Sequence, residues 1–328
     1  MIRADKTVMP IIKYIADYSS DYAEKKLLSG KKLTELPSKK YVDDISKAFN
    51  EMMLIYYLYG RLKINESLKK EIAKYDKKEA EKIKFAEVRT VDEDTVNKDN
   101  ISDYIGKQYR PNEAINNLIN QLKLKDGNIY KTRLNKEQLL AKARKIGILS
   151  YSDFVARVNT KLLVALDSGT PYKEFIRLLK ADQVPGMSLK DVVNMNGYWT
   201  TVARTNSSTI FHAGYLDQME EVKEFIEYEQ YNAVIKDHEQ CKALDGIIRP
   251  VGEFEANGNT IPAGFNCTAY FSIVSKVRAE AQGIKETKNW DSSVKPDTGF
   301  GGKTTTKKVC NLPKDTEKRL PKNYKTLM

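Results

Sequence analysis

The chain has 328 residues, of which 41% are hydrophobic and 30% are charged, enough for one large domain or two ordinary ones. Three cysteines are too few for a disulfide framework, which excludes a secreted, disulfide-rich scaffold. The N-terminus lacks the apolar stretch of a secretory signal, and the longest apolar run, about residues 52–59, is shorter than the ~20 residues of a membrane span. We therefore expect a soluble protein made in a cytoplasm, with no membrane partner.

The net charge is +11, with an isoelectric point near 9.2. Such a charge indicates an acidic partner, usually nucleic acid, although a surface solvated mainly by lysine explains it as well. Residues 283–328 hold eleven Lys or Arg against five Asp or Glu, a net +6. This basic tail is rich in Gly, Pro and Lys, so we predict that it is poorly ordered.

The first 85 residues show helical spacing of their apolar side chains. Gly30 offers a stop for the first helix, and Asn65 or Ser67 offers a cap for the last one. The pattern predicts three helices, over residues 9–28, 41–62 and 68–85.

The centre of the second predicted helix, residues 52–59, is apolar on all sides. Such a segment is either buried in the core or docks on another protein. Met and Tyr are favoured at protein contacts. The docking alternative would use Leu54 and Tyr57 as interface residues.

The middle of the chain begins with a polar stretch, residues 86–110, that we interpret as a linker. Turn and cap signals then predict a series of helices. They cover residues 111–122, 135–146, 152–166 and about 171–180, followed by a long helix from Ser188 to about Met219. Ser188 and Asp191 form a capping-box pattern at its start.

Beyond Phe225 the pattern changes to short strands. We predict a strand near the end of residues 225–235, in which Val234-Ile235 forms a hairpin with residues 247–248 that follow the turn at Leu244-Asp245-Gly246. A third strand is predicted over residues 269–274. The predicted fold class is α+β, mainly α-helical. Its parts are a helical N-terminal region with linker (1–110), a central domain (111–282) and the basic tail (283–328).

His238, Cys241 and Cys267 carry side chains that bind zinc. A structural site needs a fourth ligand, for which the candidates are Asp237, Glu239 and Cys310. The alternative is a pair of buried cysteines near a turn. A disulfide between Cys241 and Cys267 would need an oxidising medium.

Catalytic motifs are weak. Gly302-Lys303-Thr304 looks like the end of a phosphate-binding loop, but the first glycine of that motif would fall at Asp297. A His and a Cys three residues apart rarely align as nucleophile and base, and two histidines are too few for a two-metal nuclease. We predict no catalytic residues and no enzymatic activity.

Several pieces of the chain, in this order, resemble the Mu-F-like phage head morphogenesis family. They are Phe154-Val-Ala-Arg-Val158, Gly169-Thr-Pro-Tyr-Lys-Glu-Phe175, Arg204-Thr-Asn206, Ala213-Gly-Tyr215, Gln218-Met219, His238-Glu-Gln-Cys241, Leu244-Asp-Gly246 and Ile261-Pro262 to Cys267. The resemblance covers about residues 150–275. Ala269 stands where the family often has a second cysteine, and Tyr215 where it often has Arg.

The resemblance implies a minor head protein of a tailed phage or prophage. Such a protein assembles with the portal protein and the major capsid protein and lies inside the head near the portal. The resemblance marks Arg204, Asn206, Asp245, Gly246 and Pro262 as structural motif residues. The basic tail would contact packaged double-stranded DNA. Two alternatives stay open: a toxin or other effector that carries such a domain, and an accessory DNA-binding protein.

Overall fold

The computed structural model describes residues 2–29, 33, 36–75, 115–116, 118–120, 122, 129, 133–167, 172–184, 187–234, 236, 238–265 and 267–328. The predicted linker 86–110, residues 76–85 of the third predicted helix and most of the helix predicted over 111–122 lie outside this set.

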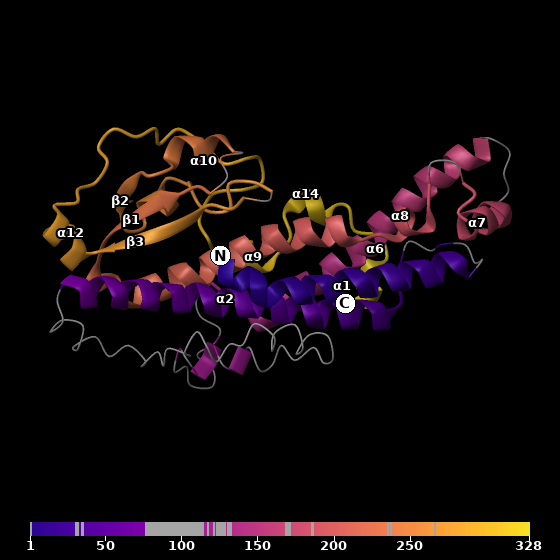
Figure 1. Ribbon diagram of the computed structural model, residues 1–328, viewed down its shortest axis with the longest axis horizontal. Helices are drawn as coiled ribbons and strands as arrows, with labels where there is room; N and C mark the ends of the chain where they lie inside the picture. Colours follow the sequence, from indigo (N-terminus) through magenta and orange to yellow (C-terminus); the bar gives the residue numbers. More distant parts are fainter. Residues whose placement is uncertain are drawn as a thin grey trace. The chain divides into compact units, whose positions relative to one another are not determined.

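Helices make up most of the described chain (Figure 1). The long ones are α1 (Ile2–Leu28), α2 (Lys39–Tyr75), α6 (Lys136–Asp167) and α9 (Asn196–Glu221). The short ones are α7 (Tyr172–Lys180), α8 (Leu189–Val193), α10 (Glu239–Leu244), α11 (Glu253–Ala256), α12 (Lys276–Gln282), α13 (Thr306–Cys310), α14 (Lys314–Glu317) and the 3-10 turns η1 (Lys223–Phe225) and η2 (Tyr324–Leu327). With one small sheet, this confirms the predicted mainly α-helical α+β class.

The sheet has three antiparallel strands in the order β2-β1-β3. They are β1 (Ile226–Asn232), β2 (Ile248–Pro250) and β3 (Tyr270–Ser275). β3 confirms the third predicted strand. β1 pairs with β2 through Tyr228, Glu229 and Gln230, so the hairpin predicted for Val234-Ile235 is wrong in its residues. β1 ends at Asn232, and the Ala233 N–H donates to Asp245 Oδ1 at 2.8 Å instead of continuing the ladder. The connection from β1 to β2 contains α10.

The chain divides into two compact units that alternate along the sequence. The first comprises Met1–Val8, Glu51–Lys136 and Ala203–Cys310; the second comprises Met9–Asn50, Glu137–Val202 and Asn311–Met328. The boundaries that we predicted at residues 110 and 282 stay predictions.

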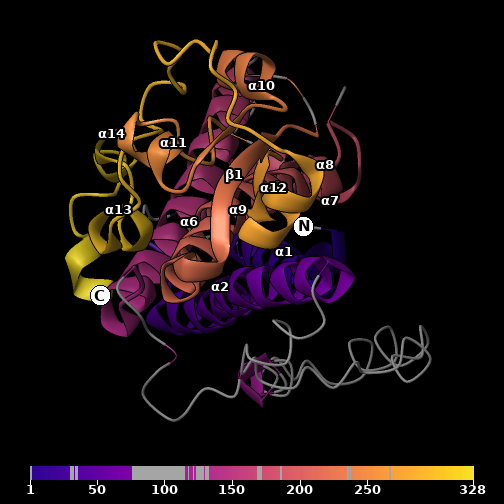
Figure 2. The ribbon, with the colours of Figure 1, turned by 90° about the vertical axis from the view of Figure 1, so that its left-hand side faces the viewer.

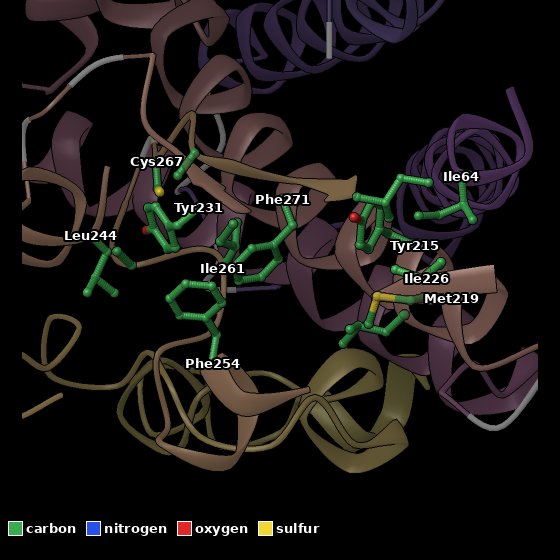
Figure 3. Close-up of a cluster of buried hydrophobic side chains, with 14 of the residues drawn as sticks. Ile64, Tyr215, Met219, Ile226, Tyr231, Leu244, Phe254, Ile261, Cys267 and Phe271 are labelled. Atoms are coloured by element: carbon green, nitrogen blue, oxygen red, sulfur yellow. The ribbon is translucent and has the colours of Figure 1, made fainter. Parts of the chain in front are cut away.

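The first unit holds the sheet, which lies beside α9 (Figure 1, Figure 2). A buried cluster joins side chains from α2, α9, β1, β3, α10, α11 and the loop before β3 (Figure 3). We call it the sheet cluster: Ile64, Leu68, Ile72, Tyr215, Leu216, Met219, Ile226, Tyr231, Cys241, Leu244, Phe254, Ile261, Ala263, Cys267, Ala269, Phe271 and Ile273.

Two glycines let α2 and α9 approach closely in this unit. A Cβ atom on Gly60 would overlap the carbonyl oxygen of Phe211, and one on Gly214 would overlap that of Tyr57. Beside this contact the Tyr57 hydroxyl donates to Asp217 Oδ2 at 2.6 Å. The backbones of the two helices thus touch at these positions, and only glycine, which has no Cβ, fits there.

The docking role predicted for residues 52–59 is corrected by the structure. Leu54 is 7% exposed and Tyr57 0%, and the Tyr57 hydroxyl is engaged with Asp217. Residues 52–58 are therefore buried in the core, as the first of the two interpretations held.

α2 also runs through the break predicted at Asn65 or Ser67. Both side chains can cap a helix, but Ile64 and Leu68 on either side are fully buried in the sheet cluster. Burial of these apolar side chains stabilises the continuous helix more than a cap would stabilise a new one.

The second unit contains α6. The sequence predicted a helix that ends at residue 146, but α6 continues through Gly147 to Asp167. A Cβ at Gly147 would lie 3.3 Å from Ile45 Cγ2 of α2. The glycine therefore allows α6 to pack closely against α2. The Ser188–Asp191 capping box is confirmed. The helix that it starts ends at Val193, and α9 begins separately at Asn196.

A tyrosine hydroxyl and an indole meet on one serine in this unit. Tyr41 Oη donates to Ser19 Oγ (3.2 Å) and lies 3.1 Å from Ser150 Oγ, while Trp199 Nε1 donates to Ser19 Oγ (3.0 Å). Tyr41 and Trp199 are both 1% exposed. Hydrogen bonding lets these polar groups enter the core.

None of the described helices is long and apolar enough to cross a membrane. The basic segment 283–328 is described throughout and forms α13, α14 and η2. Val309 and Cys310 in α13 are fully buried.

Candidate functional site

Of the candidate zinc residues, the two cysteines meet within the sheet cluster. His238 is the N-cap residue of α10, Cys241 lies in the first turn of that helix, and Cys267 lies in the loop before β3. The two sulfur atoms are 3.7 Å apart, and the cysteines are 0% and 3% exposed. The fold thus makes the pair of buried cysteines that was the alternative to a zinc site.

His238 is turned to other partners. Its Nδ1 lies 2.9 Å from Asp297 Oδ2, and its Nε2 lies 3.2 Å from the carbonyl oxygen of Phe265. A Cβ on Gly264 would overlap both the imidazole and the Asp297 carboxylate. The histidine and Asp297 therefore hold the loop at residues 264–265, and both ring nitrogens are engaged.

The structure gives the zinc hypothesis no support. Glu239 pairs with Lys242 at 2.7 Å, and the Cys310 thiol lies against the Asn135 carbonyl oxygen. Asp237 lies outside the described residues. Within the part of the chain that the structure describes, no three His, Cys, Asp or Glu side chains are grouped to hold a metal ion.

The two thiols have different electrostatic environments. The hydrogen bond from Cys241 lowers the pKa of Cys267, and the backbone N–H groups of Ala263 and Ala269 add to this. The contact with Cys267 and burial raise the pKa of Cys241. Cys267 is thus the sulfur whose thiolate is stabilised.

Polar side chains surround Cys241 on its other side. Tyr231 Oη lies 3.4 Å from the Cys241 sulfur. Gln240 Nε2 donates to Tyr231 Oη at 3.2 Å and to the Thr260 carbonyl at 3.1 Å. These bonds fix α10 to β1 and to the loop at residue 260.

Asp245 and Gly246 make the turn that the sequence predicted. Asp245 Oδ1 accepts from Ala233 N, and Oδ2 pairs with Lys236 at 2.8 Å; both contacts lower the pKa of Asp245. Gly246 has a φ of +84°, which glycine adopts without strain. Its N–H donates to the Tyr231 carbonyl at 2.8 Å.

The remaining motif residues are Pro262, Arg204 and Asn206. Pro262 follows a cis peptide bond within the loop that leads to Cys267. Arg204 is exposed on α9 and Asn206 is half-buried. Asp245 and Pro262 thus lie next to Leu244 and Ile261 of the sheet cluster, whereas Arg204 and Asn206 lie on α9.

Two buried titratable residues were missed by the sequence reasoning. Glu229 in β1 is 1% exposed, its Oε1 accepts from Gly252 N at 2.9 Å, and burial raises its pKa to about 8. His212 in α9 is 3% exposed, and burial lowers its pKa to about 3. Its Nε2 has no hydrogen-bond partner among the described residues. The alternation of β1 could have identified Glu229, because it shares a face with the buried Tyr231.

Comparisons of the chain with protein-family models, with curated proteins and with solved structures found no match.

Proposed function

We propose that this chain is a minor head protein of a tailed phage or prophage, which binds the portal protein and the major capsid protein during head assembly. The proposal rests on the ordered motif pieces between residues 154 and 267 that resemble the Mu-F-like head morphogenesis family. It is a structural role, carried by surfaces and not by a catalytic centre.

The observation that carries the proposal is where the later motif pieces lie. Met219, Cys241, Leu244, Ile261 and Cys267 come from separate stretches of the chain, and all belong to the sheet cluster (Figure 3). Residues far apart in sequence that share one core are what a common fold requires. Their meeting supports the view that the motif pieces describe one folded unit and are not chance matches.

The polar motif residues in this unit support the same conclusion. Asp245 and His238 each contact backbone or side-chain groups that fix a loop. Gly246 supplies a turn conformation. At each of these positions the local structure explains why this amino acid is present. This is expected if the motif residues stabilise the fold and partners bind to other parts of its surface.

Contact with packaged DNA is the second part of the proposal. Five exposed lysines lie in the C-terminal segment of the first unit, after α12: Lys285, Lys288, Lys295, Lys303 and Lys307. Lysine contacts with phosphates give binding that is independent of sequence and sensitive to salt. The net +6 of residues 283–328 supports this role.

Affinity purification tests the assembly role. The tagged full chain is expressed with its neighbouring open reading frames, and the proteins recovered with it are identified. We expect portal or major capsid protein. Phe254→Asp, a charge in the sheet cluster, should abolish recovery, whereas Phe265→Asp, at a position 60% exposed, controls for the added charge. A well-expressed chain that recovers neither protein contradicts the proposal, and toxicity on expression alone favours the effector alternative.

The salt dependence of DNA binding tests the second part. The slope of log K against log salt becomes shallower by about 0.9 for each phosphate that the protein no longer neutralises. Lys285→Glu, Lys288→Glu and Lys303→Glu together should therefore flatten the slope by about 3. A control with the same net charge changes the exposed Lys13, Lys69 and Lys70 to Glu. Equal slopes for the two triple variants would refute DNA contact through this segment.

A further inference from the structure

The thiol pair has a geometry that the proposed assembly role does not use. Cys241 and Cys267 are 26 residues apart in sequence, yet their sulfur atoms are 3.7 Å apart. A disulfide requires about 2 Å between the sulfurs. To form the bond, the two sulfurs must approach each other by less than about 2 Å. Cys310 lies elsewhere, against Asn135.

The sulfurs are held by polar contacts and are not merely buried among apolar groups. Tyr231 Oη lies against Cys241, and Gln240 holds that hydroxyl in place. On the other side, backbone N–H groups of Ala263 and Ala269 point to Cys267. The two sulfurs therefore face each other in a fixed arrangement.

Cys267 is the more accessible of the two. Cys267 is 3% exposed and lies two residues from Phe265, whose side chain is 60% exposed, whereas Cys241 lies in α10 and is 0% exposed. The loop that carries Cys267 is thus the side of the pair nearer to solvent. Hydrogen peroxide has the required size and leaves no bulky group on the sulfur.

We propose that Cys241 and Cys267 form a peroxide-sensitive pair that closes to an intramolecular disulfide, with Cys267 oxidised first. The Cys267 thiolate attacks one peroxide oxygen, the O–O bond breaks, and the departing hydroxide takes a proton to become water. The Cys267 sulfenic acid is then attacked by the Cys241 sulfur. The S–S bond forms, the S–O bond breaks, and the leaving hydroxide takes the Cys241 proton. Two thiols and one peroxide thus give one disulfide and two waters.

The bond joins α10 to the loop that leads into β3. Both segments contribute side chains to the sheet cluster. The disulfide would therefore keep them from separating. A cross-link of this kind restricts the unfolded chain. The oxidised protein should therefore unfold at a higher temperature than the reduced protein.

The test treats the native full chain with hydrogen peroxide and measures its mass under denaturing, non-reducing conditions. We expect a decrease of about 2 Da, a peptide that links Cys241 to Cys267, and the same result for Cys310→Ser. In Cys241→Ser, dimedone should trap a sulfenic acid at Cys267. In Cys267→Ser, Cys241 should react at least tenfold more slowly.

Wild-type protein decides the proposal even if a variant fails to fold. A wild-type chain that shows no linked peptide while Cys310 or methionines become oxidised would overturn it. Equal trapping at Cys241 in Cys267→Ser and at Cys267 in Cys241→Ser would overturn the assigned order.

Discussion

Glu229→Gln is expected to change how the stability of the first unit depends on pH. Glu229 lies in the middle strand, opposite Arg249 of β2 and Ile273 of β3. It is 1% exposed, and burial raises its pKa to about 8 from an ordinary value of 4.5; the neighbouring carboxylates Glu253 and Glu255 add to the shift. Glutamine matches the shape of the neutral acid and cannot ionise.

The direction follows from proton binding. Below pH 4.5 the Glu229 carboxyl is protonated in both the folded and the unfolded protein. Between pH 4.5 and 8 only the unfolded chain releases the proton, so the free energy of unfolding falls by about 1.4 kcal/mol per pH unit. Over the whole window Glu229 removes on the order of 5 kcal/mol of stability.

His212 acts in the opposite direction at lower pH. Burial lowers its pKa to about 3 from 6.5, so between pH 3 and 6.5 the unfolded chain binds the extra proton and stability rises with pH. The two effects cancel between about pH 4.5 and 6.5. From pH 6.5 to 8 Glu229 acts alone of the two and lowers stability by about 2 kcal/mol.

Urea unfolding between pH 5 and 8 checks this reasoning. Trp290 packs against the sheet cluster, so its fluorescence in a Trp199→Phe background reports on the first unit. Between pH 6.5 and 8 the free energy of unfolding of the Trp199→Phe protein should fall, and that of the same protein with Glu229→Gln should not. The difference between the two should therefore grow by about 2 kcal/mol over this range. Glu227→Gln, an exposed position on the same strand, is the matched control. If both variants follow the background across this range, the burial argument for Glu229 is refuted.

Three further substitutions test the packing. Gly214→Ala should cost about 3 kcal/mol or more in urea unfolding, because its Cβ overlaps a backbone oxygen of α2; Gly197→Ala, a position in α9 with open space around it, should cost nothing. Tyr57→Phe should cost about 1–2 kcal/mol, since it removes a donor from a buried carboxylate; equal stability would show that the hydrogen bond is unimportant. Gly264→Ala should displace the imidazole of His238, seen as a changed histidine ring signal by NMR. An unchanged ring signal would contradict the clamping of this loop.

Local signals predicted the elements whose ends are determined by local chemistry. The capping box at Ser188 and Asp191, the turn at Asp245-Gly246 and the strand at residues 270–275 all appear in the structure. At the cap and the turn, a side chain bonds its own neighbourhood, or a glycine adopts a conformation that other residues avoid.

The errors arose where distant residues decide the outcome. Asn65 and Gly147 looked like helix boundaries, but packing against residues far along the chain keeps both helices continuous. The apolar run at residues 52–59 could not be assigned to core or interface without knowing that α9 covers Tyr57. Asp297 could not be predicted as the partner of His238, because 59 residues separate them in sequence.

The assembly role is tested most directly by sedimentation. The tagged full chain is expressed together with the neighbouring open reading frames, and the lysate is separated on a density gradient. If it is a minor head protein, the chain will sediment with capsid-sized particles, in fewer copies than the major capsid protein. A chain that stays at the top of the gradient while complete particles form without it would contradict this role.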